Sequence, residues 1–297
     1  MVSKENLNEN ITLNELIKRV HKTDISTIIE VIIKLLAVIR DPKSSAKDLK
    51  KIIEKDTPLS ARLLRLANSA YYGFRREISS IQEAIVNIGF NPVKELALTQ
   101  KVCELFQKDF HFEGYSRAAL WKHSVAVALC GKSISMKEFR EPGENIYTAG
   151  LLHNIGIIIE DQFLHKKFKE ALAQSRINKY NLSSSEKNIF GFDHTDIGRE
   201  ITEKWDFPLE LVKSIENHHE PDWIDDKLQK SSLTIYVSDY SCQRNEIGYC
   251  DAPYEDKTIY VKCLKELKIQ EKAMNFIIEE VQEEIEKMKK GGWFQNE

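Results

Sequence analysis

The sequence lacks the features that mark several classes of protein. Its five cysteines are odd in number and include no Cys-x-x-Cys pair, so neither a disulfide framework nor a zinc knuckle is expected. The first fourteen residues contain no apolar core of a signal peptide. The most apolar run, residues 28–39, is interrupted by Glu30 and Lys34 and is too short to span a bilayer. These absences predict a cytoplasmic protein with reduced thiols and no membrane segment.

A strong charge of one sign is also missing. The 43 Lys and Arg residues nearly balance the 46 Asp and Glu residues, and the net charge of −3 predicts no general affinity for polyanions. Residues 43–76 differ, because they hold nine basic side chains against three acidic ones, with three aromatic residues nearby. The short segments on either side of Pro58 could form a helix-turn-helix. We interpret this segment chiefly as a solvated basic face, with a surface for nucleic acid or an acidic protein as the alternative.

Strand signals are scarce, whereas helical periodicity recurs along the chain. Apolar residues follow helical spacing in Ile25–Arg40, and Ile81–Ile88 stands between the potential caps Ser79-Ser80 and Gly89. A second pattern begins near Tyr115, where Ala and Val residues predict a long helix over 118–136. Further helices are predicted over 146–160, 162–178, 194–206, 208–219, 228–245 and 268–290, with a loop at 246–258.

These segments predict an all-α fold in two helical lobes. The expected domains are an N-terminal extension (1–19), a first lobe (20–114), a second helical lobe (115–245), and a C-terminal loop and helix (246–297). The charged helix over 268–290 is expected to be solvated, and Trp293 and Phe294 behind it are expected to dock on the body.

Residues 151–156 read Leu-Leu-His-Asn-Ile-Gly, and further histidines stand at wide intervals on both sides of them. These are His123 upstream, and His194, His218 and His219 downstream, together with Asp239. Histidines and a carboxylate at such intervals suit a metal site assembled between helices. A hydrolytic site of that kind would want a carboxylate beside His153, but the sequence has the neutral amide of Asn154. Each histidine alone is also typical of a buried, hydrogen-bonded core residue, so both interpretations stay open.

Several motifs in a fixed order resemble one known family. The first are IEKDTPLSARLLRLANSAYYG at residues 53–73 and ISSIQEAIVNIG at residues 78–89. Those that follow are Trp121–Ser124, Gly150–Gly156, Asp193-His194, Trp205–Pro208 and His218-His219. Together they resemble bacterial HDOD domains, relatives of the HD and HD-GYP phosphohydrolases, over roughly residues 20–245. The resemblance implies a signalling or regulatory module with the two-lobed helical fold.

The resemblance also implies which residues would hold metal. In HD relatives, matching positions bind one or two ions; here they are His123, His153, Asn154, His194, His218 and Asp239. Because an amide brings no charge, we expect a vestigial or weak site for a divalent or iron ion, and no catalytic residue or other cofactor. The chain also lacks the Gly-Tyr-Pro segment that follows the paired histidines of HD-GYP enzymes, which argues against cleavage of cyclic dinucleotides.

Two finer expectations concern single residues. Side chains of adjacent residues point about 100° apart on a helix, so at most one of His218 and His219 should face the pocket, and we favour His218. Glu186 matches a position that is often acidic in the family, and we expect an ordinary solvated helix residue there.

These features favour a non-catalytic regulatory protein whose degenerate HD pocket supports the sensing of a small signalling ligand or the binding of a protein partner. The main alternative is a metal-dependent phosphohydrolase of the HD superfamily that tolerates Asn154. A second alternative is a nucleic-acid-associated regulator that uses the basic segment.

Overall fold

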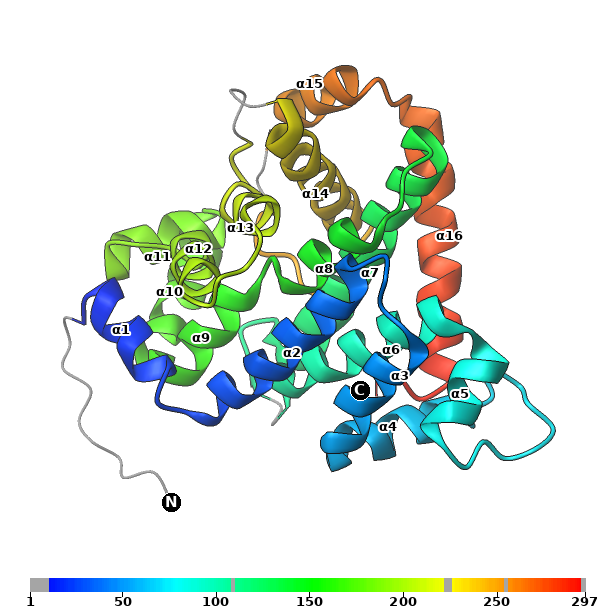
Figure 1. Ribbon diagram of the computed structural model, residues 1–297. Coiled ribbons are helices and arrows are strands. Elements are labelled where there is room, and N and C mark those ends of the chain that lie inside the picture. Colours follow the sequence, from blue (N-terminus) through cyan, green and yellow to red (C-terminus); the bar gives the residue numbers. More distant parts are fainter. Residues whose placement is uncertain (1–10, 108–109, 222–225, 254–255, 295–297) are drawn as a thin grey trace.

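The computed structural model describes residues 11–107, 110–221, 226–253 and 256–294, and over these ranges the chain is all-α apart from one β-hairpin (Figure 1). The first half contains α1 (Leu13–Val20), α2 (Asp24–Arg40), α3 (Ala46–Lys55), α4 (Thr57–Ala67), α5 (Ile81–Ile88), α6 (Phe90–Cys103) and the 3₁₀ turn η1 (Glu104–Phe106). The hairpin pairs β1 (His111–Phe112) with β2 (Tyr115–Ser116) in antiparallel register. The predicted all-α fold is confirmed, and residues 1–10 of the expected extension lie outside the described ranges.

The second half begins with the long helix α7. Its elements are α7 (Arg117–Ile134), the π-helical turn η2 (Ser135–Phe139), α8 (Glu144–Leu152), α9 (Ile155–Phe163), α10 (His165–Asn178), α11 (Leu182–Phe190), α12 (His194–Lys204), α13 (Leu209–Glu216), α14 (Asp226–Arg244), α15 (Lys257–Leu267) and α16 (Glu271–Lys290). Of these, α11 and α15 were not predicted from the sequence, and neither were α1 and the hairpin.

Helix starts follow the local chemistry of the sequence. The Ser80 hydroxyl accepts a hydrogen bond from the backbone N–H of Glu83, and Ser45 forms a capping box with Asp48. Helix α5 has the predicted bounds, and Gly89 behind it has φ +107, a conformation that L side chains rarely adopt. The caps expected at Ser79-Ser80 and Gly89 are confirmed.

The prediction of one helix over 146–160 is wrong. Helix α8 ends at Leu152 and α9 begins at Ile155, because Asn154 leaves helical geometry with φ −95 and ψ 21. Gly156, in the first turn of α9, allows the start of α12 to come close. A Cβ atom there would lie only 1.9 Å from the carbonyl oxygen of His194. The break therefore places His153 and Asn154 at a turn that lies against another helix.

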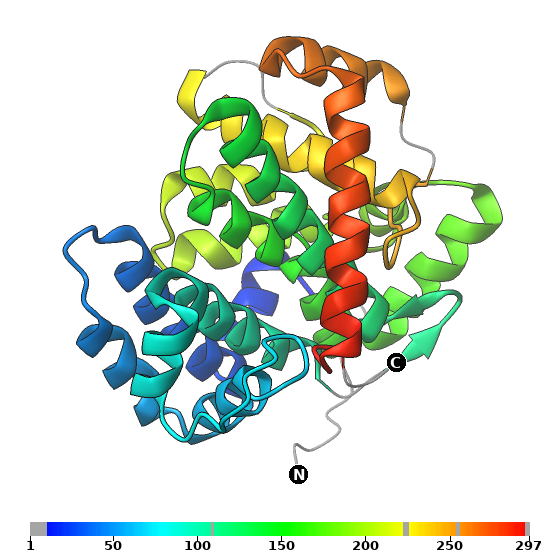
Figure 2. The ribbon, with the colours of Figure 1, turned by 90° about the vertical axis from the view of Figure 1, so that its right-hand side faces the viewer.

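The C-terminal helix α16 is not simply solvated, contrary to the expectation. One face of it is buried and consists of Met274, Ile277, Ile278, Val281, Ile285 and Met288. It packs along α7 and extends from α15 toward the short helices of the first half (Figure 2). Docking of the end of the chain is confirmed, since Phe294 is buried and the Trp293 ring centroid lies 5.5 Å from that of Tyr71.

Helices α6 and α7 connect the two halves of the chain. Helix α6 packs against α2, α4 and α5 of the first half and also against α8, while α7 packs against α8, α14 and α16. The first helix, α1, packs against α9 and α12 of the second half (Figure 1). The buried apolar side chains form one continuous cluster from Ile11 to Phe294. In the described part of the chain, none of the helices combines the length and apolar character needed to cross a membrane.

Candidate metal centre

His123, His153 and Asp239 form a first cluster of buried side chains. His123 lies on α7, His153 directly follows α8, and Asp239 lies on α14. Their potential ligand atoms all lie within 4.8 Å of one another. The Nε2 atoms of His123 and His153 lie 2.7 and 3.7 Å, respectively, from Oδ1 of Asp239. Three distant segments of the sequence thus bring nitrogen and oxygen donors to one point.

Backbone carbonyl groups fix the orientation of both rings. Nδ1 of His153 lies 2.7 Å from the carbonyl oxygen of Gly150, and Nδ1 of His123 lies 3.2 Å from that of Ile247. A carbonyl oxygen only accepts hydrogen bonds, so each Nδ1 must carry a proton and donate it, and each Nε2 faces Asp239. Burial lowers the pKa of His153 to about 4, so its ring is neutral at pH 7 and presents a bare Nε2 lone pair.

His123 differs from His153 in its charge. Its Nε2 faces the Asp239 carboxylate at hydrogen-bonding distance, and a carboxylate only accepts, so this nitrogen must also carry a proton. Burial alone would lower the pKa of His123, but the hydrogen bond and the charge of Asp239 outweigh burial and raise the pKa. The two side chains therefore form a buried ion pair. A divalent ion would compete with that proton for the same Nε2 atom.

His194, His218, His219 and Asp251 form a second cluster, whose potential ligand atoms also lie within 4.8 Å of one another. His194 starts α12, the paired histidines follow α13, and Asp251 follows α14. Nε2 of His219 lies 3.1 Å from Nε2 of His194 and 3.2 Å from Oδ2 of Asp251. The side chain of His219 is 11% exposed, whereas the other three are buried.

The rings of the second cluster are oriented in the same way as those of the first. Nδ1 of His194 lies 2.6 Å from Oε2 of Glu186, which also accepts from the backbone N–H of His194. Nδ1 of His218 lies 2.6 Å from the carbonyl oxygen of Ile215, and burial lowers the pKa of His218 well below its ordinary value. Such oxygen partners set the tautomer and direction of metal-binding imidazoles.

The two clusters adjoin and form one histidine–aspartate centre. The ring centroids of His153 and His218 lie 5.0 Å apart. Gln243 lies one turn after Asp239 on α14, and its Nε2 donates to Oδ2 of Asp239 at 2.9 Å and to Oδ1 of Asp251 at 2.8 Å. One amide group therefore positions the only two carboxylates among these seven side chains.

Asn154 follows His153 in the sequence and is buried, but its amide has unmet hydrogen-bonding capacity. Neither its oxygen nor its nitrogen has a hydrogen-bond partner within the described ranges, and the same holds for Nε2 of His153 and of His218. An unpaired buried polar group costs about 1–3 kcal/mol. Nε2 of His153 and Nε2 of His218 carry lone pairs that a cation would satisfy, so these residues fit a metal ion, whereas the Asn154 nitrogen is an N–H₂ group that a cation would not satisfy.

The charge of the centre suits one divalent ion better than two. Asp239 and Asp251 together supply two negative charges, which balance one divalent ion once that ion has displaced the proton of His123, and the Asn154 amide supplies no charge. Imidazole and carboxylate donors suit ions such as Mn²⁺, Fe²⁺ or Zn²⁺.

The structure corrects two expectations about this region. Both His218 and His219 contribute atoms to the second cluster, because α13 ends at Glu216 and helical spacing no longer applies to the pair. Glu186 is not solvated; it is fully buried and binds His194. Of the other residues proposed from the sequence as ligands, His123, His153, His194 and Asp239 lie in the centre as well. Asn154 is not among the clustered side chains, and its role as a ligand stays a prediction.

Sequence reasoning missed Asp251 and Gln243. Asp251 lies in the stretch that was expected to be a simple loop, where no periodicity marks it. The one local signal is Gly248, which has φ +87 and where a Cβ atom would lie 2.6 Å from the backbone nitrogen of His123. This close approach of the loop to α7 brings the Ile247 carbonyl to His123 and carries Asp251 back to the centre.

Comparison with known proteins agrees with this arrangement. The HDOD domain matches residues 25–221 of the chain. An uncharacterized protein of Treponema pallidum (strain Nichols) is 22% identical over 204 residues, which cover 66% of this chain and 38% of that protein. This chain therefore spans well under half the length of that relative.

Two solved structures share the fold. An HDOD domain protein of unknown function from Geobacter sulfurreducens matches with a TM-score of 0.73 at 22% identity, over 93% of this chain and 96% of that chain. A candidate phosphohydrolase from Shewanella amazonensis SB2B matches with a TM-score of 0.69 at 21% identity, over 95% and 97% of the two chains. The fold is thus common to all three proteins, and the match over residues 25–221 shows that this chain belongs to the HDOD domain family.

Proposed function

We propose that this chain is a non-catalytic regulatory protein whose histidine–aspartate centre binds one divalent ion. The ion would hold α7, α12 and α14, and the turn between α8 and α9, in one arrangement. That arrangement would present the surface that a protein partner or a small signalling ligand recognises. The observation that carries the proposal is that the donors are fixed in orientation and yet almost completely buried.

Burial argues against hydrolysis at this centre. Within it, His123, His153, His194 and His218 are 0% exposed, and Asp239 and Asp251 are at most 2% exposed. A metal ion in an open HD site supplies charge that activates water and polarises a phosphoryl group. A phosphate ester would have to reach that ion through closely packed side chains, and Asn154 does not supply the bridging charge that two ions would need.

A metal-dependent phosphohydrolase remains the second candidate, because one specific observation favours it. Seven side chains in two adjoining clusters offer ligand atoms, which is more than a purely structural site for one ion needs. The name of the Shewanella amazonensis structure points to the same chemistry for that protein.

Turnover assays separate the two candidates. The full chain, purified without an affinity tag, is incubated with nucleotides, cyclic dinucleotides and phosphate monoesters in the presence of Mn²⁺, Fe²⁺ or Mg²⁺. We expect no sustained release of product. Sustained turnover that disappears in His153→Ala, but persists in His165→Ala on the exposed side of α10, would overturn the regulatory proposal.

A nucleic-acid role has less support. Arg62 is bound to Glu104, and Lys101 lies 2.5 Å from Asp56 and 2.9 Å from Glu104, so acidic partners engage part of the basic segment and its surroundings. Helix α4, which would follow the turn of a helix-turn-helix, uses Leu59, Leu63 and Leu66 for the core. These contacts favour the interpretation of the segment as a solvated face.

A further inference from the structure

One cavity of the molecule has aromatic rings on five of its thirteen described lining residues. It has a volume of about 410 Å³, within the range typical of small-molecule sites. Its walls come from the loop after α4, from α5 to α8, and from the end of α16. They include Tyr71, Tyr72, Phe74, Tyr147, Glu284 and Trp293. None of the seven side chains of the histidine–aspartate centre lines this aromatic cavity.

The rings of the aromatic cavity form walls and not a single stack. Tyr71 stands at 81° to Tyr72 and at 60° to Trp293, with ring centroids 4.8 and 5.5 Å apart. Tyr72 and Phe74 are nearly parallel, at 9°, with centroids 6.3 Å apart. Rings at such different angles offer their electron-rich faces in several directions.

The charged groups among the lining residues are acidic. Glu95 and Glu284 line the aromatic cavity, and no Lys or Arg is among the described residues that do so. Glu284 accepts a hydrogen bond from the Tyr71 hydroxyl, and its other contact is with Lys287, at 3.7 Å, on the exposed side of α16. An exposed ion pair of that length is weak, so most of the negative charge of Glu284 remains effective in the cavity.

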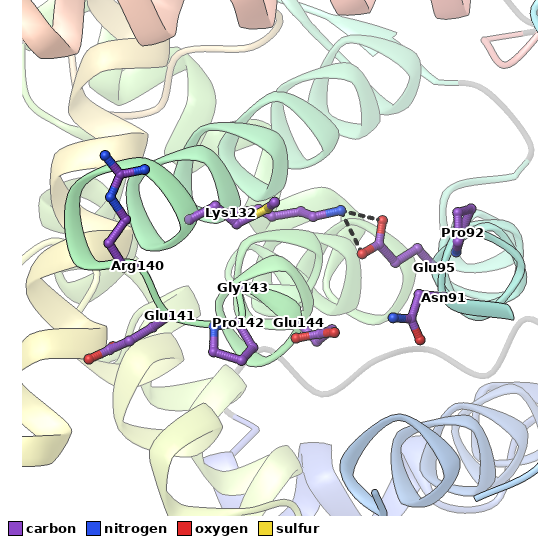
Figure 3. Close-up of a pocket in the computed structure, with 10 residues that line it drawn as sticks. Asn91, Pro92, Glu95, Lys132, Arg140, Glu141, Pro142, Gly143 and Glu144 are labelled. Atoms are coloured by element: carbon purple, nitrogen blue, oxygen red, sulfur yellow. Dashed lines mark hydrogen bonds and ion pairs between the residues drawn. The ribbon is translucent and has the colours of Figure 1, made fainter. Parts of the chain in front are cut away.

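Glu95 is shared with an adjoining cavity, where its charge is neutralised. Lys132 lines that second cavity and lies 2.6 and 2.7 Å from the two carboxylate oxygens of Glu95 (Figure 3). The same ammonium lies 5.7 Å from the ring centroid of Tyr147, so one wall of the aromatic cavity already contacts a cation. The described contacts place no such cation over Tyr71, Tyr72, Phe74 or Trp293.

Trp293 adds an unsatisfied donor. Its indole N–H is buried and has no hydrogen-bond partner in the described part of the chain. A buried N–H without an acceptor is costly, so a ligand that brings an oxygen acceptor would gain from meeting it.

We propose that the aromatic cavity binds an organic cation, with a quaternary ammonium or protonated amine group held between the aromatic rings and Glu284, and with an oxygen acceptor for Trp293. The site is separate from the metal centre and does not depend on it. Cation–π contacts account for the rings, the carboxylate for the sign of the charge, and the indole N–H for the acceptor.

Trp293 also supplies the readout for a test. The chain has four tryptophans, and the indole N–H resonance of Trp293 is identified by its loss in Trp293→Phe. The full chain is titrated with choline, with tetramethylammonium, and with 3,3-dimethylbutan-1-ol, the uncharged isostere of choline. We expect the Trp293 resonance to shift saturably with choline, less with tetramethylammonium, which has no acceptor, and not with the uncharged isostere.

Variants locate the effect in the aromatic cavity. Glu284→Gln removes the charge and is expected to weaken choline binding at least about threefold, whereas Glu283→Gln, on the exposed face of the same helix, leaves it unchanged. Phe74 is 40% exposed, so Phe74→Leu leaves the fold intact and is expected to cost about two- to fivefold in affinity, the range of one exposed cation–π contact. Equal binding of the uncharged isostere, no saturable binding of either cation, or equal losses in Glu283→Gln and Glu284→Gln would each overturn the proposal.

Discussion

The histidine–aspartate centre and the aromatic cavity are two sites built on opposite physical principles. In the centre, hydrogen bonds from the rings to carbonyl groups and to Glu186 fix the ring orientations, and burial is nearly complete. In the aromatic cavity, packing between Tyr71 and the far end of α16 forms the walls, and Phe74 remains 40% exposed. The first arrangement would suit a small ion through its donor geometry, and the second would suit a larger ligand through its shape and charge.

The difference extends to stability. The centre holds buried polar atoms without partners, at His153, Asn154 and His218, so an ion that binds them also stabilises the fold. Among the described residues that line the aromatic cavity, the one buried polar atom without a hydrogen-bond partner is the indole nitrogen of Trp293. Perturbing the centre should therefore affect folding more strongly than perturbing the cavity.

The largest expected effect comes from Gly156→Ala, which tests whether the centre depends on close helix contact. The new Cβ atom would lie 1.9 Å from the carbonyl oxygen of His194, and backbone cannot yield as a flexible side chain can. We expect a loss of more than about 3 kcal/mol in the free energy of unfolding, measured by denaturant titration.

Gly191→Ala is the control for this variant. Gly191 also has an unusual conformation, with φ +84, but a Cβ atom there meets nothing within 4 Å. We expect a loss of about 1–2 kcal/mol from backbone strain alone. Equal losses in the two variants would show that the contact between α9 and α12 is not the cause.

A smaller effect is expected from Glu186→Gln, which tests whether ring orientation matters. The change removes the charge opposite Nδ1 of His194 but keeps the shape of the side chain. We expect metal affinity to fall about 10- to 100-fold, the usual cost of losing an oriented partner of a metal-binding imidazole. Calorimetric titration measures it, with Glu170→Gln on the surface of α10 as the matched control. Unchanged affinity would mean that His194 takes no part in binding.

The smallest effect is expected from Gly291→Ala, which perturbs the aromatic cavity. A Cβ atom at this position would lie 2.7 Å from Cβ of Tyr71, closer than real Cβ contacts, so Tyr71 must move. We expect a loss of about 1 kcal/mol in stability, at the lower end of the range for overpacking, and weaker choline binding with unchanged metal affinity. Lys290→Ala, exposed on the same helix, is the control. A parallel loss of metal affinity would show that the two sites are coupled.

The sequence predicted the centre better than the cavity for a physical reason. His123, His153 and His194 occur in motifs whose order is itself informative. Local patterning placed His194 at the start of a helix but placed His153 inside one unbroken helix. Asp251 reaches the centre and the amide of Gln243 on α14 only because the chain turns back after α14, and no local pattern encodes that return. Helical spacing also gave the wrong prediction for His219, because that spacing requires a continuous helix and α13 ends at Glu216.

The aromatic cavity shows the same limit more strongly. Tyr71 and Trp293 are more than two hundred residues apart, and the sequence predicted only that the C-terminal aromatic residues would dock somewhere on the body. Trp293 reaches Tyr71 because the apolar face of α16 packs on the body. The alternating charges of that helix predict a solvated surface instead, so the sequence does not predict this contact.

The most direct test of the central claim is a calorimetric titration of the metal-free, tag-free full chain with Mn²⁺, beside the variant Asn154→Asp. The two carboxylates of the centre balance one divalent ion, so we predict one ion per chain in the unchanged protein. A third carboxylate should raise the affinity at least about tenfold. Two ions per chain in the unchanged protein, no binding, or no gain in Asn154→Asp would contradict the account of a closed, one-ion regulatory centre.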